Sequence, residues 1–493
     1  MADTLFGTPS VVPICWTGAL AIGTCVALAA TANADVVVSS EQTQNMSCSA
    51  GVCEPTASHA VLNVSDLENL LASGDVTVTT TGSGVQAKNI DVEAPFTWST
   101  QSSLALDAAF AIAIDRQISV AGQSWLSLTT NGQIQALTFG SKGRTTFQNL
   151  SSQLTVNGTA YTLVNSIESL ASAIASNPSG AYALANDYDA SQDGTYTSAP
   201  IQTFFNGTFE GLGNTISHLS IDDESNIPDD LGLFYVVDES GVIGHVRLAW
   251  VSVTGGQPKV AQFRVGALVG GYTTGYLFQD SATGTVRLIG GKEGLAGGLA
   301  SVNGGYVDSC FARTSVTVKH AKGRADVGGL VGSNSVGAVT RSFATGSVSG
   351  GDSDRTGGLV GFNGGYDGGT VENSYATGAV KGGSYVGGLI GVTSKSDIEY
   401  SYSTGAVSGG ISSVVGGFAG RNIEPRIQSD NYWDTTTSGT TQGVGQGGAV
   451  NITGLTTQQL QSGLPAGFDP GVWAEKSRIN NGLPYLLANP PQK

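Results

Sequence analysis

Between about residues 200 and 434, short apolar runs recur with glycine between them and do not follow a helical period. One unit is VGGLVGSNSVGAVTRSFATG (327–346), in which β-branched and aromatic residues form two or three runs broken by glycine. Such runs are typical of strand, turn and strand, whereas helical repeats need long runs of good helix formers. The pattern therefore predicts repeated short β-strands.

The apolar motif returns at a nearly constant distance. Its first glycines are separated by 31, 31, 29, 30 and 29 residues. A period of about 30 residues is typical of a solenoid and is shorter than the 40 or more residues of a four-stranded propeller blade. We therefore predict an all-β fold, a parallel β-helix (β-solenoid). The repeat glycines are Gly266, Gly297, Gly328, Gly357, Gly387 and Gly416.

The motif residues have distinct expected places in each coil. The glycine pairs are predicted at corners, where a positive φ costs little without a Cβ and the next coil can approach closely. One aliphatic and one aromatic residue per coil are expected to stack into ladders along the solenoid, the aliphatic one inside. The ladder residues are Leu330, Leu359 and Leu389, and Phe343, Tyr375 and Tyr402.

The remaining segments depart from this pattern. SDLENLL (65–71) has Ser65 and Glu68 at capping-box spacing and predicts a short helix, and IESLASAIASN (167–177) predicts a second. The tail contains a short helix and is expected to cover the last open coil. The predicted segments are 1–34, a signal peptide; 35–165, a β-rich region that admits further coils; 166–199, a helix-containing connector; 200–434, the β-helix repeats; and 435–493, a C-terminal capping segment.

The first residues have the features of an export signal. An apolar stretch within 16–37 ends in Ala32-Asn33-Ala34 before Asp35, which is typical of a signal peptide and its cleavage site. No Lys or Arg precedes the apolar run, so a buried apolar strand and a misassigned start codon stay open as alternatives. No other stretch reaches the roughly 18 uninterrupted apolar residues of a membrane helix. We expect the mature protein to be soluble or attached to a surface.

Composition and charge narrow the function. Of 493 residues 71 are Gly, 40% are hydrophobic and 12% are charged, which is too apolar for disorder and too poor in charge for a helical bundle. The net charge of −16 repels nucleic acid and anionic membrane surfaces. We therefore expect no nucleic-acid partner.

The cysteines fit an exported protein. Cys48 and Cys53, in CSAGVC, are candidates for a disulfide bond in an oxidising compartment, with two free thiols as the alternative. Cys310 is interpreted as a small packed residue and not as a nucleophile, because it occupies the repeat column of three serines. Those serines are Ser342, Ser374 and Ser401.

Several motifs in the same order resemble those of a known family. FNGTFEGLGNTISHLSI (205–221), the repeated VGGLVG followed by SYATG, NYWD (431–434) and FDPGVWAEKSRINNGLPYLL (468–487) resemble the GLUG-motif repeat proteins, which occur in filamentous-haemagglutinin-like bacterial exoproteins. The resemblance covers roughly residues 200–490. It implies a right-handed parallel β-helix, export and an adhesin-like role at the cell surface, and it carries over no catalytic residue.

One local motif suggests a cation site. In DYDASQDGTY (187–196), Asp189, Ser191 and Asp193 place oxygens at alternate positions before Gly194, as the opening of a calcium loop does. The completing Glu is absent, and a polar turn in which the Asp side chains bond their own backbone is the alternative. No other cofactor is expected.

The sequence offers little for catalysis. No G-x-S-x-G motif occurs and the four histidines are scattered. We expect a secreted or outer-surface, adhesin-like binding or structural protein whose partner is carbohydrate or a cell surface. A β-helix polysaccharide lyase or hydrolase and a non-adhesive matrix or biofilm protein are the alternatives. The charged residues nearest the repeat corners are expected to be isolated and solvated; they are Asp326, Arg341, Arg355 and Lys381.

Overall fold

The computed structural model describes residues 35–223, 229–256, 262–290, 293–319, 323–352, 354–424, 426 and 428–491. All of these residues belong to one compact unit, Ala34–Lys493. The predicted signal peptide, with Cys15 and Cys25, lies outside the described residues. Asp35, which follows the predicted cleavage site, begins the first strand.

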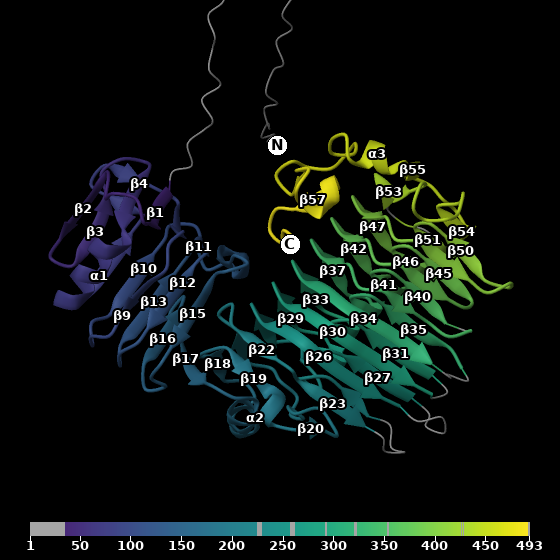
Figure 1. Cartoon of the computed structure of the whole chain (residues 1–493), viewed down its shortest axis with the longest axis horizontal. Helices are drawn as coiled ribbons and strands as arrows, with labels where there is room; N and C mark the ends of the chain where they lie inside the picture. Colours follow the sequence, from purple (N-terminus) through teal and green to yellow (C-terminus); the bar gives the residue numbers. More distant parts are fainter. Residues whose placement is uncertain are drawn as a thin grey trace, which may run out of the picture. The chain divides into compact units, whose positions relative to one another are not determined.

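The repeats form stacked coils in which every strand pairs in parallel with its counterpart one coil further on (Figure 1). In one coil the chain runs through β35 (Ala325–Gly328), β36 (Val331–Ser335), β37 (Ala338–Thr340), β38 (Phe343–Ala344) and β39 (Val348–Ser349). The register follows the sequence repeat, since Gly328 pairs with Gly357 and Gly357 with Gly387. The predicted all-β parallel solenoid is confirmed.

Four sheets run along this stack of coils. The first contains β24 (Asp230–Leu231), β27 (Gln262–Gly266), β31 (Glu293–Gly297), β35, β40 (Arg355–Gly357), β45 (Tyr385–Gly387) and β50 (Val414–Gly416). The second contains β28 (Val269–Thr273), β32 (Ala300–Asn303), β36, β41 (Val360–Gly364), β46 (Ile390–Ser394), β51 (Ala419–Ile423) and β54 (Val444–Gly447).

The third and fourth sheets complete each coil. The third contains β17 (Thr159–Val164), β18 (Ala181–Leu184), β21 (Thr208–Glu210), β25 (Val242–Gly244), β29 (Tyr276–Phe278), β33 (Tyr306–Asp308), β37, β42 (Thr370–Glu372), β47 (Asp397–Glu399) and β52 (Gln428–Ser429). The fourth contains β19 (Tyr188–Asp189), β20 (Thr195–Tyr196), β22 (Thr215–Ser217), β23 (Ser220–Asp223), β26 (Arg247–Gly255), β30 (Ser281–Ile289), β34 (Phe311–Lys319), β38, β39, β43 (Tyr375–Ala376), β44 (Val380–Gly382), β48 (Tyr402–Ser403), β49 (Val407–Gly409), β53 (Asn431–Asp434) and β55 (Ile452–Leu455).

Residues 35–156 form a separate stack of parallel strands, which precedes the repeats in the chain and is called the first stack. One sheet contains β14 (Leu137–Phe139), β11 (Ile112–Ile114), β8 (Asn89–Val92), β1 (Asp35–Ser39) and β4 (Ala60–Asn63), and another β15 (Arg144–Phe147), β12 (Gln117–Val120) and β9 (Phe96–Trp98). The third sheet continues into this stack through β16 (Gln153–Val156), β13 (Trp125–Thr129), β10 (Leu104–Asp107), β5 (Val76–Thr79), β3 (Val52–Pro55) and β2 (Met46–Ser49). A small hairpin joins β6 (Thr81–Gly82) and β7 (Val85–Gln86), and η1 (Ile134–Ala136) precedes β14.

The chain reverses between the two stacks. β16 and β17 are antiparallel, and the two residues between them, Asn157 and Gly158, both have positive φ. Asn-Gly favours this tight hairpin turn. The stacks then bond to each other, since the N–H groups of Thr145 and Phe147 donate to the carbonyls of Leu212 and Ala185 at 2.9 and 2.8 Å.

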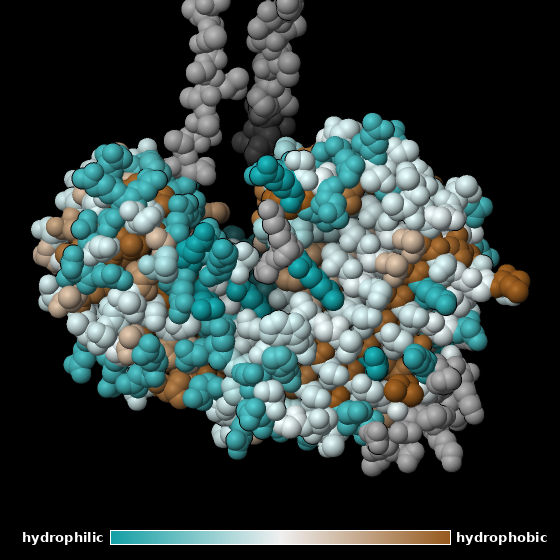
Figure 2. All heavy atoms as spheres, viewed as in Figure 1, coloured by the Kyte–Doolittle hydropathy of each residue, from teal (hydrophilic) through white to brown (hydrophobic). Residues whose placement is uncertain are grey.

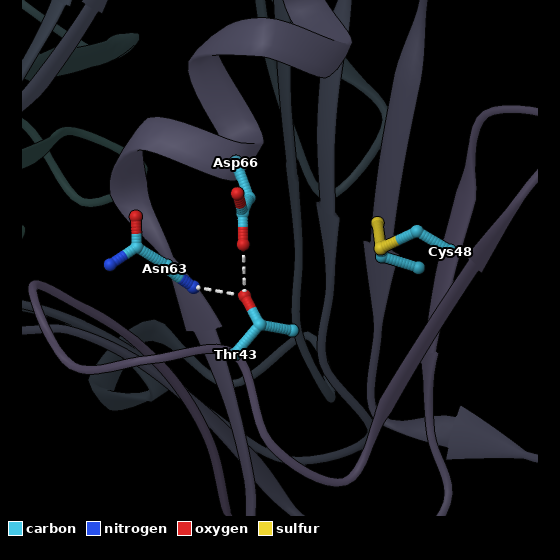
Figure 3. The surroundings of a disulfide bond; sticks show 5 residues. Thr43, Cys48, Asn63 and Asp66 are labelled. Atoms are coloured by element: carbon cyan, nitrogen blue, oxygen red, sulfur yellow. Dashed lines mark hydrogen bonds between the residues drawn. A yellow bond between two sulfur atoms is a disulfide. The ribbon is translucent and has the colours of Figure 1, made fainter.

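The N-terminal end of the first stack is closed by a hairpin and a helix. Cys48 in β2 and Cys53 in β3 form a disulfide bond beside α1 (Val64–Ser73), where the Thr43 hydroxyl donates to Asp66 and accepts from the Asn63 N–H (Figure 3). The expected capping box is wrong, because Asn63 caps the helix and accepts from the Ser65 N–H at 2.8 Å. The carboxylate of Glu68 instead accepts from the Thr97 N–H at 2.9 Å.

The second predicted helix is present. α2 (Ile167–Ser176) begins at a capping box formed by Ser166 and Ser169. Ile167, Leu170 and Ile174 bury one face of the helix in the core. β18, which follows α2, already belongs to the third sheet, so residues 166–199 contribute to the solenoid as well as connecting its parts.

The motif positions require glycine because other backbone atoms approach them closely, and not because their φ is positive. None of the six first glycines has a positive φ, which corrects that part of the expectation. A Cβ on Gly328 would lie 1.9 Å from the carbonyl oxygen of Val331, and one on Gly329 would lie 2.0 Å from that of Gly358 in the next coil. The left-handed corner positions are instead taken by residues with side chains, such as Ser309 and Asn373.

The aliphatic ladder points into the core of the solenoid, whereas the aromatic ladder points away from it. Leu330, Leu359 and Leu389 are fully buried in the main core. The rings of Phe311, Phe343, Tyr375 and Tyr402 stack with centroids 5.0, 4.8 and 5.1 Å apart, but they belong to a separate cluster. Because Ala344 and Ala376, their neighbours along the strands, face the core, the aromatic ladder faces outward.

The C-terminal segment covers this aromatic ladder. It contains α3 (Thr457–Leu460), β56 (Trp473–Ala474), η3 (Asn480–Gly482) and β57 (Tyr485–Leu486), and Figure 1 shows β57 beside the third sheet. The indole N–H of Trp473 donates to Asn373 at 2.9 Å, the Tyr402 hydroxyl donates to the Pro484 carbonyl at 2.6 Å, and the Asn489 amide donates to the Ser309 carbonyl at 2.7 Å. We expected the segment to cover the last coil; these contacts run along the side of the solenoid.

Buried polar side chains connect the coils from within. In one column, each side chain accepts a hydrogen bond from the backbone N–H of the coil before it; the column is Asp280, Cys310, Ser342, Ser374, Ser401 and Asn431. Cys310 is fully buried there, and burial raises the pKa of its thiol. In the second sheet the Asn303 amide donates to Asn334, and the Asn334 amide to Asn363, at 2.8 and 2.7 Å.

The charges near the corners are paired, which corrects the expectation of isolated solvated groups. Arg355 forms an ion pair with Asp326, and both side chains are largely buried. Arg341 pairs with Asp308, which also accepts from the Tyr276 hydroxyl at 2.8 Å. Lys381 does lie exposed, in β44. These ion pairs join neighbouring coils.

The glycine contacts predict a sharp cost for the smallest substitution. A Cβ on Gly358 would lie 2.1 Å from the carbonyl oxygen of Gly388. Gly358→Ala should therefore lower the free energy of unfolding by about 1–3 kcal/mol, the usual cost of overpacking. Gly74→Ala is the control, since Gly74 has an extended φ of 168° and no atom within 4 Å of an added Cβ. Equal urea midpoints for the two variants would contradict this reading.

Asp280 predicts a pH-dependent stability. The side chain is fully buried, and among the described residues no partner bonds its Oδ2, so burial holds the pKa of this carboxyl well above its usual range. A raised pKa in the folded state means that stability is lost as pH rises from about 4 toward that pKa. Asp280→Asn should therefore be increasingly more stable than the wild type over this window, as Asn431 already fills the same position in the last coil. Thermal unfolding from pH 3 to 8 measures this, with exposed Asp107→Asn as the control.

Candidate functional site

The three residues of the predicted calcium motif lie at the end of β19 and in the turn that leads to β20. Asp189, the last residue of β19, caps η2 (Ala190–Gln192), and its Oδ1 accepts from the Ser191 N–H at 3.0 Å. Asp193 ends that turn and accepts from the hydroxyls of Tyr188 and Tyr196. The two carboxylates therefore bond to local partners, as in the polar-turn alternative, and calcium binding stays a prediction.

Asp189 connects this turn to the next coil. Its Oδ1 lies 2.9 Å from Nδ1 of His218, which follows β22. The Ser191 N–H and the imidazole lower the pKa of the Asp189 carboxyl. The carboxylate thus holds the imidazole ring in one orientation at the surface.

The imidazole in turn supports an exposed indole. The rings of His218 and Trp250 stack with centroids 5.1 Å apart and an angle of 18° between their planes. Trp250 lies one coil further on in β26 and is 67% exposed. Asp189, His218 and Trp250 form a row across three successive coils, which we call the tryptophan platform.

The backbone holds the two rings outward. His218 and Trp250 have positive φ of 56° and 53°, a conformation that bulky residues rarely adopt. The register of β26 against β30 shifts between Leu248 and Val251, so Trp250 lies in a β-bulge. Bulges redirect a side chain away from the regular sheet face.

Hydroxyl groups surround the platform. The hydroxyl oxygens of Thr195 and Ser220 lie 3.2 Å apart, and the Thr283 hydroxyl accepts from the backbone N–H of Trp250 at 3.1 Å. Burial, followed by the bond to Asp193, raises the pKa of Tyr188 to about 12, so its hydroxyl keeps its proton. The site therefore combines an apolar ring face with neutral hydroxyls and carboxylate oxygens.

The sequence analysis found Asp189 but missed His218 and Trp250. The hydrogen bond between the His218 imidazole and the Asp189 carboxylate spans 29 residues, close to the repeat period. The register pairs Asp189 with Ser217, so aligning the early, irregular coils would have placed His218 next to the position of Asp189. Their chemistry was hidden because the early coils carry the repeat motif only weakly.

Over the part of the chain that the structure describes, no group of three or more His, Cys, Asp or Glu side chains is arranged to hold a metal ion. Within the same residues, no helix combines the length and the apolar character needed to cross a membrane.

Comparison with known families identifies the repeats. A family model of the GLUG motif matches residues 352–381 and 382–408, which are two successive coils of the solenoid. The chain carries GLUG repeats. The resemblance seen in the sequence is thereby confirmed for these coils, and the regular GLUG coils lie beyond the platform in the chain.

A curated protein and two solved structures are similar to parts of the chain. Halomucin of Haloquadratum walsbyi is 42% identical over 93 residues, which are 19% of this chain and 1% of Halomucin. A Bacteroides ovatus protein provisionally named an immunoglobulin A1 protease is 19% identical, covers 62% of this chain and 86% of its own, and has a TM-score of 0.38. A structure named IgA1 protease is 17% identical, covers 54% of this chain and 21% of its own, and has the same TM-score. The expected lack of catalysis stays a prediction.

The local bonds of Asp189 and Asp193 predict a weak response to calcium. A ligand that binds the folded state raises the melting temperature, and oxygens already engaged in hydrogen bonds bind less well. We expect millimolar Ca²⁺, or its removal with a chelator, to shift the melting temperature by less than about 1 °C. A larger, concentration-dependent rise that Asp189→Ala abolishes would instead establish the calcium site.

Proposed function

We propose that this chain is an exported, surface-associated protein that binds carbohydrate, as an adhesin does, with the side of its solenoid. The GLUG repeats and the likeness to Halomucin support a place outside the cell. So does the disulfide between Cys48 and Cys53, because such bonds persist in oxidising compartments.

The tryptophan platform is the observation that carries this proposal. A sugar ring has an apolar face of C–H groups and a rim of hydroxyls. The exposed indole of Trp250 offers a rigid apolar surface, and Trp contributes such contact area with little loss of side-chain freedom. The hydroxyls of Ser220 and Thr195, which lie in adjacent strands, provide bonding partners for the rim.

The rest of the surface favours weak, repeated contacts over one tight site. On the face that Figure 2 shows, neutral and hydrophilic residues dominate and hydrophobic residues form short streaks. A polymer that touches several coils gains avidity from each contact without any strong single bond. A polysaccharide of a neighbouring cell or matrix meets this description.

Removal of the indole tests the proposal. On a glycan array, the wild type should bind at least one polysaccharide class, and Trp250→Ala should weaken that binding about tenfold or more, as truncation of a Trp at the centre of a contact does. Tyr366→Ala is the matched control, since Tyr366 is a 91% exposed aromatic residue of another coil. His218→Phe, which keeps a ring beneath the indole, should retain more binding than His218→Ala.

The outcomes separate the alternatives. Equal binding by the wild type and Trp250→Ala, or no binding to any glycan, would contradict the platform and favour a purely structural matrix protein. Release of new reducing ends from a bound polysaccharide would support a polysaccharide-degrading enzyme.

A further inference from the structure

A cavity of about 230 Å³ lies where three parts of the chain meet. One wall is the turn at Asp115 and residues 138–141 of the first stack, another is formed by the coils around Arg247 and Phe311, and the third is the end of the C-terminal segment, residues 487–490. None of these residues belongs to the tryptophan platform.

The walls are fixed by hydrogen bonds. The guanidinium of Arg247 donates to the carbonyls of Gly140 and Gly143 at 2.7 and 3.1 Å, which holds the turn of the first stack. The Gln279 side chain accepts from the Phe139 N–H at 3.3 Å and donates to the Ala488 carbonyl at 3.1 Å, so it joins that turn to the C-terminal segment. The cavity is thus organised before any ligand arrives, which lowers the entropic cost of binding.

The cavity lies at the end of the aromatic ladder, since Phe311 is one of its lining residues. Phe311 is the first ring of that ladder, and its stacking partner Phe343 lies 5.0 Å away with the two planes 3° apart. In the coil before, the position paired with Phe311 is Ser281. Its small side chain leaves space where a further ring would lie. The guanidinium carbon of Arg313 lies 5.4 Å from the centre of the Phe311 ring, but Arg313 does not line the cavity.

We propose that this cavity binds a single neutral pyranose ring, stacked on Phe311 in the space above Ser281. Pockets for drug-sized ligands occupy about 300–1,000 Å³, so a smaller cavity suits one ring better than a chain. The exposed carboxylate of Asp115 accepts from sugar hydroxyls and repels an acidic sugar. Arg247 leaves few N–H donors for the carboxylate of an acidic sugar, because its guanidinium already donates to three backbone carbonyls.

This inference extends the proposed function and rests on separate residues. The platform binds the side of a polymer, whereas the cavity binds one ring, such as the end of a chain. Saturation-transfer NMR with a panel of neutral methyl pyranosides and methyl uronosides tests the cavity alone, because monosaccharides give the platform no avidity.

Ser281→Phe is the decisive variant, because a Phe side chain would extend the ladder by one ring and fill the space. We expect at least one neutral pyranoside to bind the wild type, and Ser281→Phe to reduce that binding at least tenfold with an unchanged or higher melting temperature. Ser315→Phe, a change on the outer side of β34 away from the cavity, should leave binding unaffected. Asp115→Ala, at an exposed position, provides a second variant and should weaken binding clearly.

Several results would overturn the proposal that the cavity binds a neutral pyranose. It fails if no pyranoside binds, if uronosides bind better than neutral sugars, or if Ser281→Phe and Asp115→Ala bind as the wild type does. Should Trp250→Ala abolish binding to polysaccharide while monosaccharide binding persists, the platform and the cavity are separate sites. Loss of monosaccharide binding in Trp250→Ala would overturn the assignment to the cavity.

Discussion

Contact between backbones, with no side chain between them, is the constraint on which this solenoid depends. In the motifs from Val327 onward the third glycine lies against the first sheet: a Cβ on Gly361 would lie 2.4 Å from the backbone nitrogen of Val327, and one on Gly391 would lie 2.7 Å from that of Thr356. The first two glycines of the motif meet their own coil and the next coil in the same way. In these coils three glycines therefore allow two sheets and successive coils to approach each other at once, whereas the two earlier coils have the small residues Ala267 and Ser301 at two of these positions.

These contacts between backbones do not by themselves determine the register of the strands, since a glycine-rich strand can shift along its neighbour. The buried polar columns supply the missing specificity. A shift of the register by one residue would separate the backbone N–H of Cys310 from Ser342 and the amide of Asn303 from Asn334. Buried polar groups without a hydrogen-bond partner are costly. The interpretation of Cys310 as a member of the serine column was right for this reason: like the serines, its side chain accepts from the backbone N–H of the coil before it and donates to the carbonyl two residues earlier.

The sequence predicted the structural features that recur from coil to coil and missed those that do not recur. The period, the parallel strands and the identity of the ladder residues followed from regular spacing. The outward orientation of the aromatic ladder did not, because Phe343 is buried on that side by the C-terminal segment, which lies more than 100 residues further along the chain. The pairing of Arg341 with Asp308, and of His218 with Asp189, was equally hidden, since each joins different positions of neighbouring coils. Spacing within one motif carries no information about such contacts.

Departures from the repeat determine where this surface is chemically distinctive. In the regular coils the outward aromatic column is already filled, first by its own stacked rings and then by Trp473 and Phe468 of the C-terminal segment. In the earlier coils the same regularity fails twice: a bulge turns Trp250 outward, and Ser281 stands where a ring before Phe311 would lie. Both irregularities leave an aromatic face without a protein ring upon it. The regular coils thus supply length and rigidity, and the irregular coils supply the surfaces on which a ligand ring can stack.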